Sequence, residues 1–317
     1  MWVYIVYCIL AVAASAVLLA GALVGHLRDE AHRLSESRYA RRYMEMITAR
    51  MLDGESVPMV RFPMCGCRGA REVLARLLAE AAVSTSPSDP AAVRRMVAAN
   101  GVEGWLLRRV RLSHGCNRSR YMAMLSSLPV SRTTAECVRR YSDDGGCRMR
   151  FRTMLVAIAA EPSAAFKLIG DYPAKLTRLE MAELTSMLCR GMVPLAYAPM
   201  LASQNRNLQM LGLNIVRIFG AAEAECRLLK IVSESESEVC DEAIDVMAVL
   251  HLPLQYRSVV HRIRSMSTCA RRSLFRRLAS EGYSVDALVR LAASGERRYA
   301  ESLAASYKRT LVCHCPI

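Results

Sequence analysis

Residues 207–252 read NLQMLGLNIVRIFGAAEAECRLLKIVSESESEVCDEAIDVMAVLHL, and their apolar residues recur at intervals of three and four. This spacing places side chains on one face of an α-helix. It predicts one helix up to Phe219, a second before the polar break at Ser233 to Ser237, and a third after it. The three predicted apolar faces consist of Leu208, Leu211, Gly212, Ile215, Val216 and Phe219, then Leu228, Leu229, Ile231 and Val232, then Val239, Ala243, Ile244, Met247 and Leu250.

A helix with one apolar face cannot bury that face alone, so neighbouring helix pairs must stack. The pattern therefore predicts an all-α fold built as an α-solenoid. Aromatic residues are only 6% of the 317-residue chain, which favours helices over sheets. Further helix pairs are expected at about 117–141, 148–171, 177–203, 205–233, 238–266 and 268–294, with a terminal helix near 295–312.

The helical pairs are expected to begin at about residue 70, with an amphipathic helix from Arg71 to Val83. A helix over residues 26–52 ends at Gly54 and Pro58, and a turn-rich connector then runs to about residue 69. Two short helices, 91–99 and 102–112, flank Asn100-Gly101, a sequence typical of a helix C-cap. We therefore divide the chain into residues 1–25, a juxtamembrane segment 26–69, a helical repeat domain 70–312 and a tail 313–317.

Residues 1–25, MWVYIVYCILAVAASAVLLAGALVG, contain no charged side chain. A helix of this length crosses the hydrocarbon core of a bilayer, and Trp2, Tyr4 and Tyr7 suit its interface. A cleaved signal peptide with Ala14-Ser15-Ala16 at the cleavage site is the alternative, but a basic segment before the apolar run is missing. The basic residues that follow favour an N-terminus outside and a body in the cytoplasm. The expected location is the inner (cytoplasmic) membrane, with a single span.

Twelve cysteines occur without the spacing of a disulfide framework, as expected in a reducing compartment. Cys65 and Cys67, together with Cys313, His314 and Cys315, could supply zinc ligands. The two groups are nearly 250 residues apart, so thiols in a connector and a tail are the simpler interpretation. No metal site, cofactor or catalytic residue is predicted, and no phosphate-binding glycine motif is present.

Residues 205–266 resemble HEAT repeats, with Val216-Arg217 in the first helix and Asp241 and Asp245 in the next. The resemblance extends most clearly over 177–295 and reaches back to about residue 70. It implies a curved, armadillo-like scaffold of stacked helices that holds a partner protein. It implies no catalytic residues.

Arginine dominates the formal charge of +14, and one stretch from Val246 to Ser280 contains seven arginines and no acidic residue. Arginines on successive helices of a solenoid could align into a stripe that binds phosphates, anionic lipid or an acidic protein surface. A solvated helix face without a ligand is the plainer alternative. The candidate partner-binding residues are Arg257, Arg262, Arg264, Arg271, Arg272, Arg276 and Arg277.

These features favour a non-enzymatic, membrane-anchored adaptor whose cytoplasmic solenoid binds a protein, such as an envelope glycosyltransferase in the membrane. The alternative is a nucleic-acid-binding protein of the DNA-repair type that uses an arginine-rich face. That alternative requires aromatic residues among the arginines, and few are present, so nucleic acid is not the expected partner. A third reading, a carrier with methionines lining an acyl groove, conflicts with the usual place of methionine in a core.

Overall fold

A computed structural model describes residues 36–51, 61–63, 68–84, 90–144, 146–189, 196–235, 237–292 and 294–303. Within these ranges the chain is all-α and has no β-strand, which confirms the all-α part of the predicted fold class. The predicted membrane span 1–25 lies outside the described residues. So do Cys65, Cys67 and the tail 313–317. Among the helices that are described, none is long and apolar enough to cross a membrane.

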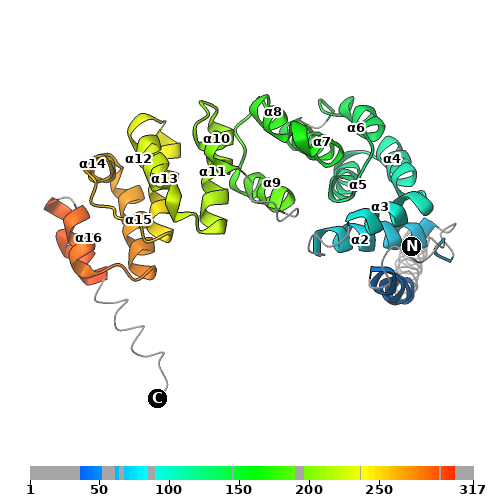
Figure 1. The fold of residues 1–317 in the computed structure, drawn as a ribbon, viewed down its shortest axis with the longest axis horizontal. Coiled ribbons are helices and arrows are strands. Elements are labelled where there is room, and N and C mark those ends of the chain that lie inside the picture. The colour runs from blue at the N-terminus through cyan, green and yellow to red at the C-terminus, as the bar shows by residue number, and fades with distance from the viewer. Residues whose placement is uncertain are drawn as a thin grey trace, which may run out of the picture. The chain divides into compact units, whose positions relative to one another are not determined.

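The helices follow one another with short connections (Figure 1). A helix over residues 36–51 precedes α2. The helices that follow are α2 (Arg68–Ser84), α3 (Pro90–Ala99), α4 (Val102–Leu112), α5 (Gly115–Ser127), α6 (Arg132–Arg139), α7 (Gly146–Ala160), α8 (Ala165–Gly170), α9 (Arg178–Cys189), α10 (Tyr197–Leu201), α11 (Arg206–Phe219), α12 (Glu225–Glu234), α13 (Ser237–Val249), α14 (Arg257–Ser265), α15 (Thr268–Ser280) and α16 (Val285–Leu291). Short 3₁₀ turns precede α8 and α12, and a helix over 297–303 follows α16.

The chain divides into two compact units, residues 1–162 and 163–317. In the first unit, α4 packs beside α6, α5 packs beside α7, and each of α4 and α6 packs on the helix that follows it. Helices α4 and α6 run parallel. Glu103 near the start of α4 accepts hydrogen bonds from the Ser131 backbone N–H and hydroxyl at 2.8 and 2.6 Å, while Arg111 near its end contacts Cys137 Sγ at 3.8 Å. Two rows of helices thus enclose the core of this unit.

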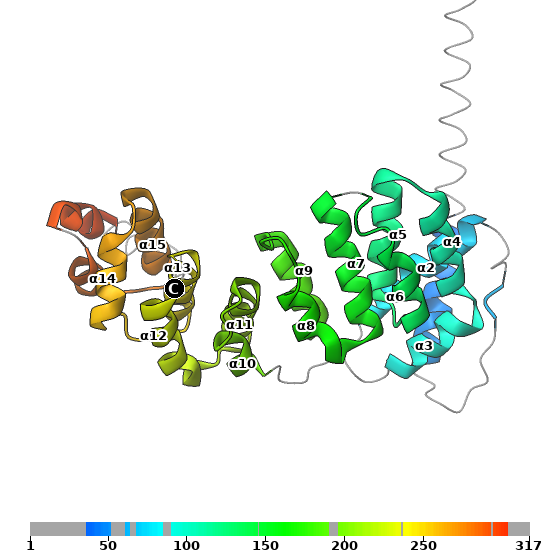
Figure 2. The same ribbon diagram turned by 90° about the horizontal axis from the view of Figure 1, so that it is seen from above.

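The second unit repeats this arrangement of two rows (Figure 2). Helices α10, α12, α14 and α16 pack successively in one row, and α9, α11 and α13 pack successively in the other. Pairs α10–α11 and α12–α13 make the most extensive contacts. Their buried faces contain Leu211, Leu228, Ile244 and Met247, each with no more than 1% of its surface exposed.

The closest pairs differ from the predicted pairs by one helix. Residues 205–233 were expected to pair α11 with α12, whereas α10 packs on α11 and α12 packs on α13. The reason is that every helix has a neighbour on both sides along the chain. Apolar periodicity locates the buried face, but it does not say which neighbour covers that face more closely.

The predicted helices and breaks in residues 207–252 are otherwise confirmed. Asn205 caps α11 by accepting from the backbone N–H groups of Asn207 and Leu208, and Gly220 ends it with φ 65°. Phe219 is the exception within the predicted apolar face, since 49% of its surface is exposed at the last residue of the helix. The predicted C-cap before α4 is confirmed, with Gly101 at φ 60°.

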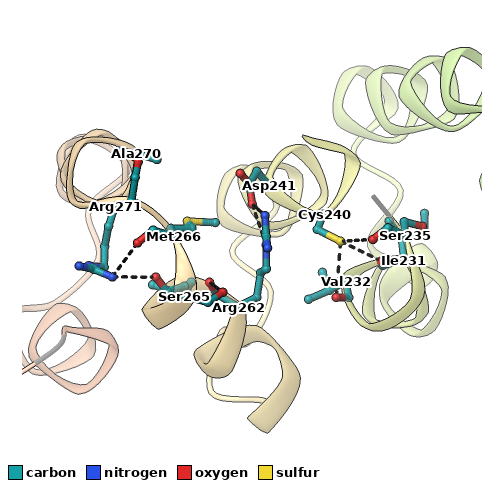
Figure 3. Close-up of polar contacts among 12 residues, drawn as sticks. Ile231, Val232, Ser235, Cys240, Asp241, Arg262, Ser265, Met266, Ala270 and Arg271 are labelled. Atoms are coloured by element: carbon teal, nitrogen blue, oxygen red, sulfur yellow. Dashed lines mark hydrogen bonds and ion pairs between the residues drawn. The ribbon is translucent and has the colours of Figure 1, made fainter. Parts of the chain in front are cut away.

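The fourth residue is buried in each of the six helices α5, α7, α9, α11, α13 and α15, whatever its chemical type. In α5, α13 and α15 this residue is polar, and its side chain contacts carbonyl groups at the C-terminal end of the preceding helix. Carbonyl groups at the end of a helix lack partners within the helix. Figure 3 shows this contact for Cys240, whose Sγ lies 3.1 Å from the Ser235 carbonyl, and for Arg271. The six residues are Arg118, Met149, Met181, Gln209, Cys240 and Arg271.

Candidate partner-binding groove

A groove of about 480 Å³ lies in the second unit along the solvent face of α9, α11, α13 and α15. Its apolar floor comes from Leu176, Met181 and Met210, all buried. Its walls are charged. The charged lining residues are Arg178, Arg206, Arg217 and Arg277 together with Glu238, Asp241, Glu242 and Asp245.

The four carboxylates of the groove all come from α13. Their spacing of three, one and three residues places them along one face of this helix. Each one is paired with an arginine from another helix. Glu238 accepts from Arg206 and Glu242 from Arg217, both on α11, while Asp245 accepts from Arg277 on α15.

The fourth carboxylate of this face, Asp241, pairs with an arginine from the other row of helices. Both Nε and Nη2 of Arg262 on α14 donate to Oδ1 of Asp241, at 2.9 and 2.7 Å (Figure 3). The row of carboxylates therefore joins α13 to α11, α14 and α15. Ion pairs of this kind fix the orientation of the helices and leave little uncompensated negative charge in the groove.

The two ends of the carboxylate row differ in their electrostatics. Hydrogen bonds from Arg206 lower the pKa of Glu238, with Lys175 adding to the effect and outweighing partial burial. Burial raises the pKa of Asp245 instead, and the nearby Glu242 raises it further, although Arg277 and Arg217 act in the opposite direction. Desolvation wins at Asp245 because its side chain is only 17% exposed, against 53% for Glu238.

Two groove arginines keep unused hydrogen-bonding capacity. The buried Nε of Arg217 has no hydrogen-bond partner, although Nη2 of the same side chain pairs with Glu242. Arg178 is exposed at the start of α9 and forms an ion pair with no carboxylate among the described residues. A buried unpaired N–H is costly unless a ligand supplies an acceptor. Arg217 Nε is itself buried, so the exposed guanidinium group of Arg178 is the donor of this pair that a ligand in the groove can reach.

The structure separates the seven arginines predicted from the sequence into two groups. Arg262, Arg271, Arg272 and Arg277 lie within 4 Å of a carboxylate, and Arg271 is itself buried. Only Arg277 of this group lines the groove. Arg257, Arg264 and Arg276 are exposed and form no ion pair within the described part of the chain.

The sequence did not predict that Arg178, Arg206 and Glu238 line one groove. The acids that neutralise the predicted arginines come from outside the acid-free stretch, from α13 and from Glu296. One sequence signal was available, because acids at positions 238, 241, 242 and 245 share a helix face. Their partners lie 21 to 32 residues away, a separation that periodicity within one helix does not reveal.

Within the part of the chain that the structure describes, no group of three or more His, Cys, Asp or Glu side chains is arranged so that it could hold a metal ion. Comparison of the chain with family models, curated proteins and solved structures finds no match. The groove and its ion pairs are therefore the features of the described residues that bear on function.

Proposed function

We propose that this protein is a non-enzymatic scaffold whose HEAT-like helical repeats bind a partner protein at the cytoplasmic face of a membrane. The repeat assignment is supported by the buried fourth residue of every second helix from α5 to α15. Cys240 and Arg271, which occupy this position in α13 and α15, lie 31 residues apart and contact equivalent carbonyls. The anchor is supported by the charge-free run of residues 1–25. In this proposal residues 1–25 span the inner membrane once, with the N-terminus outside.

The partner contributes an acidic side chain beside an apolar one. The single observation that carries this assignment is the exposed guanidinium group of Arg178, which lines the groove and forms no ion pair within the described residues. A carboxylate is the acceptor that arginine binds most strongly in proteins. Next to it, Met181 and Met210 offer an adaptable apolar surface for a neighbouring side chain.

A membrane protein, for instance an envelope glycosyltransferase, suits this proposal as the partner, because an anchored scaffold meets other membrane proteins at high local concentration. Co-purification from detergent-solubilised membranes tests the proposal, with the intact chain compared with a variant lacking residues 1–60. A specific membrane protein that elutes with the intact chain supports it, provided that Arg178→Glu releases that protein and Arg264→Glu does not.

Two results of the same experiment contradict the proposal. In one, nucleic acid is recovered with both chains and is released steeply as salt rises, which identifies a nucleic-acid-binding protein. In the other, the recovered protein stays bound to the Arg178→Glu variant as tightly as to the unmodified chain. That second result places the binding surface outside the groove.

A further inference from the structure

The ends of helices α4 and α6 in the first unit form a strongly basic edge. Residues 104–152 contain eleven arginines and only three acidic residues. Because α4 and α6 run parallel, their C-terminal ends lie together, as the contact between Arg111 and Cys137 requires. We define the basic edge as Arg108, Arg111, Leu112, Arg139, Arg140 and Arg148.

The five arginines of the basic edge are all exposed, and none forms an ion pair within the described part of the chain. The nearby acids are already engaged, since Asp143 pairs with Arg150 and Asp144 with the buried Arg118. Of the three acids between residues 104 and 152, only Glu136 is left to offset the field. The edge therefore carries a net positive charge that faces solvent.

Stabilisation of the helices explains only part of this arrangement. A basic residue in the last turn of a helix interacts favourably with the helix dipole, which accounts for Arg111 and Arg139. The dipole does not account for Leu112, which follows Arg111 at the end of α4 and is 68% exposed. An exposed leucine among arginines matches a bilayer interface, where the apolar side chain enters the acyl boundary and the guanidinium groups meet lipid phosphates.

The aromatic residues of this region are not available for stacking on nucleic-acid bases. Arg109 already lies over the rings of Trp105 and Tyr121, with its Cζ 5.4 and 5.6 Å from their centroids. Tyr141 is buried between Arg118 and Arg140, whose Cζ atoms lie 4.6 and 4.8 Å from its ring centroid. Single-strand binding relies on exposed aromatic platforms, so the edge fits lipid better than nucleic acid.

We infer that the basic edge of the first unit binds the surface of an anionic bilayer, with Leu112 inserted among the headgroups. The inference adds a second membrane contact to the proposed anchor and does not involve the groove of the second unit. An apolar insertion and several basic side chains together give stable membrane attachment where either alone is marginal. The edge would hold the body against the membrane in a defined orientation.

Native cysteines report on this contact. Cys116 near the start of α5 and Cys147 near the start of α7 are exposed at the same end of the first unit as the basic edge. Cys226 and Cys269 are exposed in the second unit and serve as internal controls. Cys269 is a matched control, because it is the second residue of α15 as Cys116 is the second residue of α5.

The experiment places the full chain in nanodiscs of phosphatidylcholine, alone or mixed with phosphatidylglycerol, and measures the rate at which a water-soluble maleimide alkylates each thiol. We expect the alkylation of Cys116 and Cys147 to slow several-fold only in the anionic discs, and high salt to abolish the slowing. Alkylation of Cys226 and Cys269 should not change between the two compositions.

Variants assign the effect to the edge. The double substitution Arg111→Glu/Arg139→Glu should remove the slowing, and Leu112→Ser should reduce it, while Arg257→Glu/Arg264→Glu should leave it intact. Equal rates in the two lipid compositions, or equal slowing of all four thiols, would overturn the inference. Protection that appears only when nucleic acid is added to phosphatidylcholine discs would overturn it too and identify a different ligand.

The disc experiment distinguishes the absence of a membrane span in residues 1–25 from the absence of lipid binding by the basic edge. Without a membrane span, phosphatidylcholine discs capture none of the chain, and the basic edge alone binds the phosphatidylglycerol discs reversibly. Salt then releases the protein, and the Arg111→Glu/Arg139→Glu variant binds at least about tenfold more weakly. The absence of binding to both kinds of disc contradicts the anchor and the inference together.

Discussion

Arg271 and Glu296 form a buried ion pair in the second unit, with only 9% and 8% of their side chains exposed. The guanidinium group also donates from Nη1 to the carbonyls of Arg264 and Met266, at 2.7 and 3.0 Å. One side chain thus satisfies the end of α14 and links α15 to the segment after α16. Arg118 makes the equivalent contacts in the first unit, to the carbonyls of Val110 and Ser113 and to Asp144.

Substitution of Arg271 should therefore be strongly destabilising. In Arg271→Ala, the buried carboxylate of Glu296 keeps only the distant, half-exposed Arg272 as a charge partner, and the end of α14 loses its donors. We expect the free energy of unfolding to fall by about 3 kcal/mol or more. Chemical denaturation followed by circular dichroism measures this loss.

Arg272 provides the adjacent control. Its Nε lies 3.8 Å from the same Glu296 carboxylate, but half of the side chain is exposed. Arg272→Ala should cost less than about 1 kcal/mol. Equal losses in the two variants would mean that Arg271 does not support the end of α14.

The raised pKa of Asp245 predicts a stability that falls as pH rises. In the folded protein this carboxyl releases its proton at a higher pH than in the unfolded chain, where its pKa is near the ordinary value of 3.8. The folded state is therefore favoured while the group is protonated, and this contribution is lost as pH rises from 3.8 through the raised pKa. Asp245→Asn keeps the neutral form, so it should be more stable than the unmodified chain at pH 7 and similar to it in acid. The melting temperatures of the variant and of the unmodified chain, measured across this pH range, test the prediction. An Asp245→Asn variant that is less stable than the unmodified chain at pH 7 contradicts it.

Glu238, on the same helix, should show the opposite pH dependence. Arg206 lowers its pKa below the ordinary value of 4.5, so the ionised form stabilises the fold at neutral pH. This stabilisation is lost as pH falls from 4.5 through the lowered pKa. Glu238→Gln should lose less than about 1 kcal/mol at pH 7, because the side chain is 53% exposed, and the loss should vanish in acid. A loss that persists unchanged in acid would show that the ion pair is not its cause.

Gly212 permits the close approach of α11 to α10. A Cβ added there would lie 3.0 Å from Met200 Cβ and 3.0 Å from Leu201 Cδ2, closer than side chains normally pack. We expect Gly212→Ala to destabilise the second unit by about 1–3 kcal/mol through overpacking. Gly104→Ala is the control, since open space surrounds that position in α4, and it should stabilise by about 0.5–1 kcal/mol. If both substitutions stabilised the protein, α10 and α11 would move apart at little cost in free energy, and the prediction for Gly212 would be wrong.

The helices were predictable from the sequence, and the contacts between them were only partly so. Periodic apolar residues and the Asn100-Gly101 signal located α3, α4 and α11 because these signals are local. The buried Arg271 was predicted as a surface residue, since arginine is rarely buried without a partner and Glu296 lies 25 residues away. The groove was not predictable for the same reason. It is formed by side chains that the stacking of α9, α11, α13 and α15 brings together.

We propose that the groove of the second unit binds an acidic segment of a partner protein. The most direct test measures the affinity of the purified chain for the partner identified by co-purification, with Arg178→Glu and the control Arg264→Glu beside the unmodified protein. We expect Arg178→Glu to weaken binding at least about tenfold, through loss of the charge pair and repulsion of the carboxylate, while Arg264→Glu has no effect. Unchanged affinity of the Arg178→Glu variant would show that the partner does not bind in the groove.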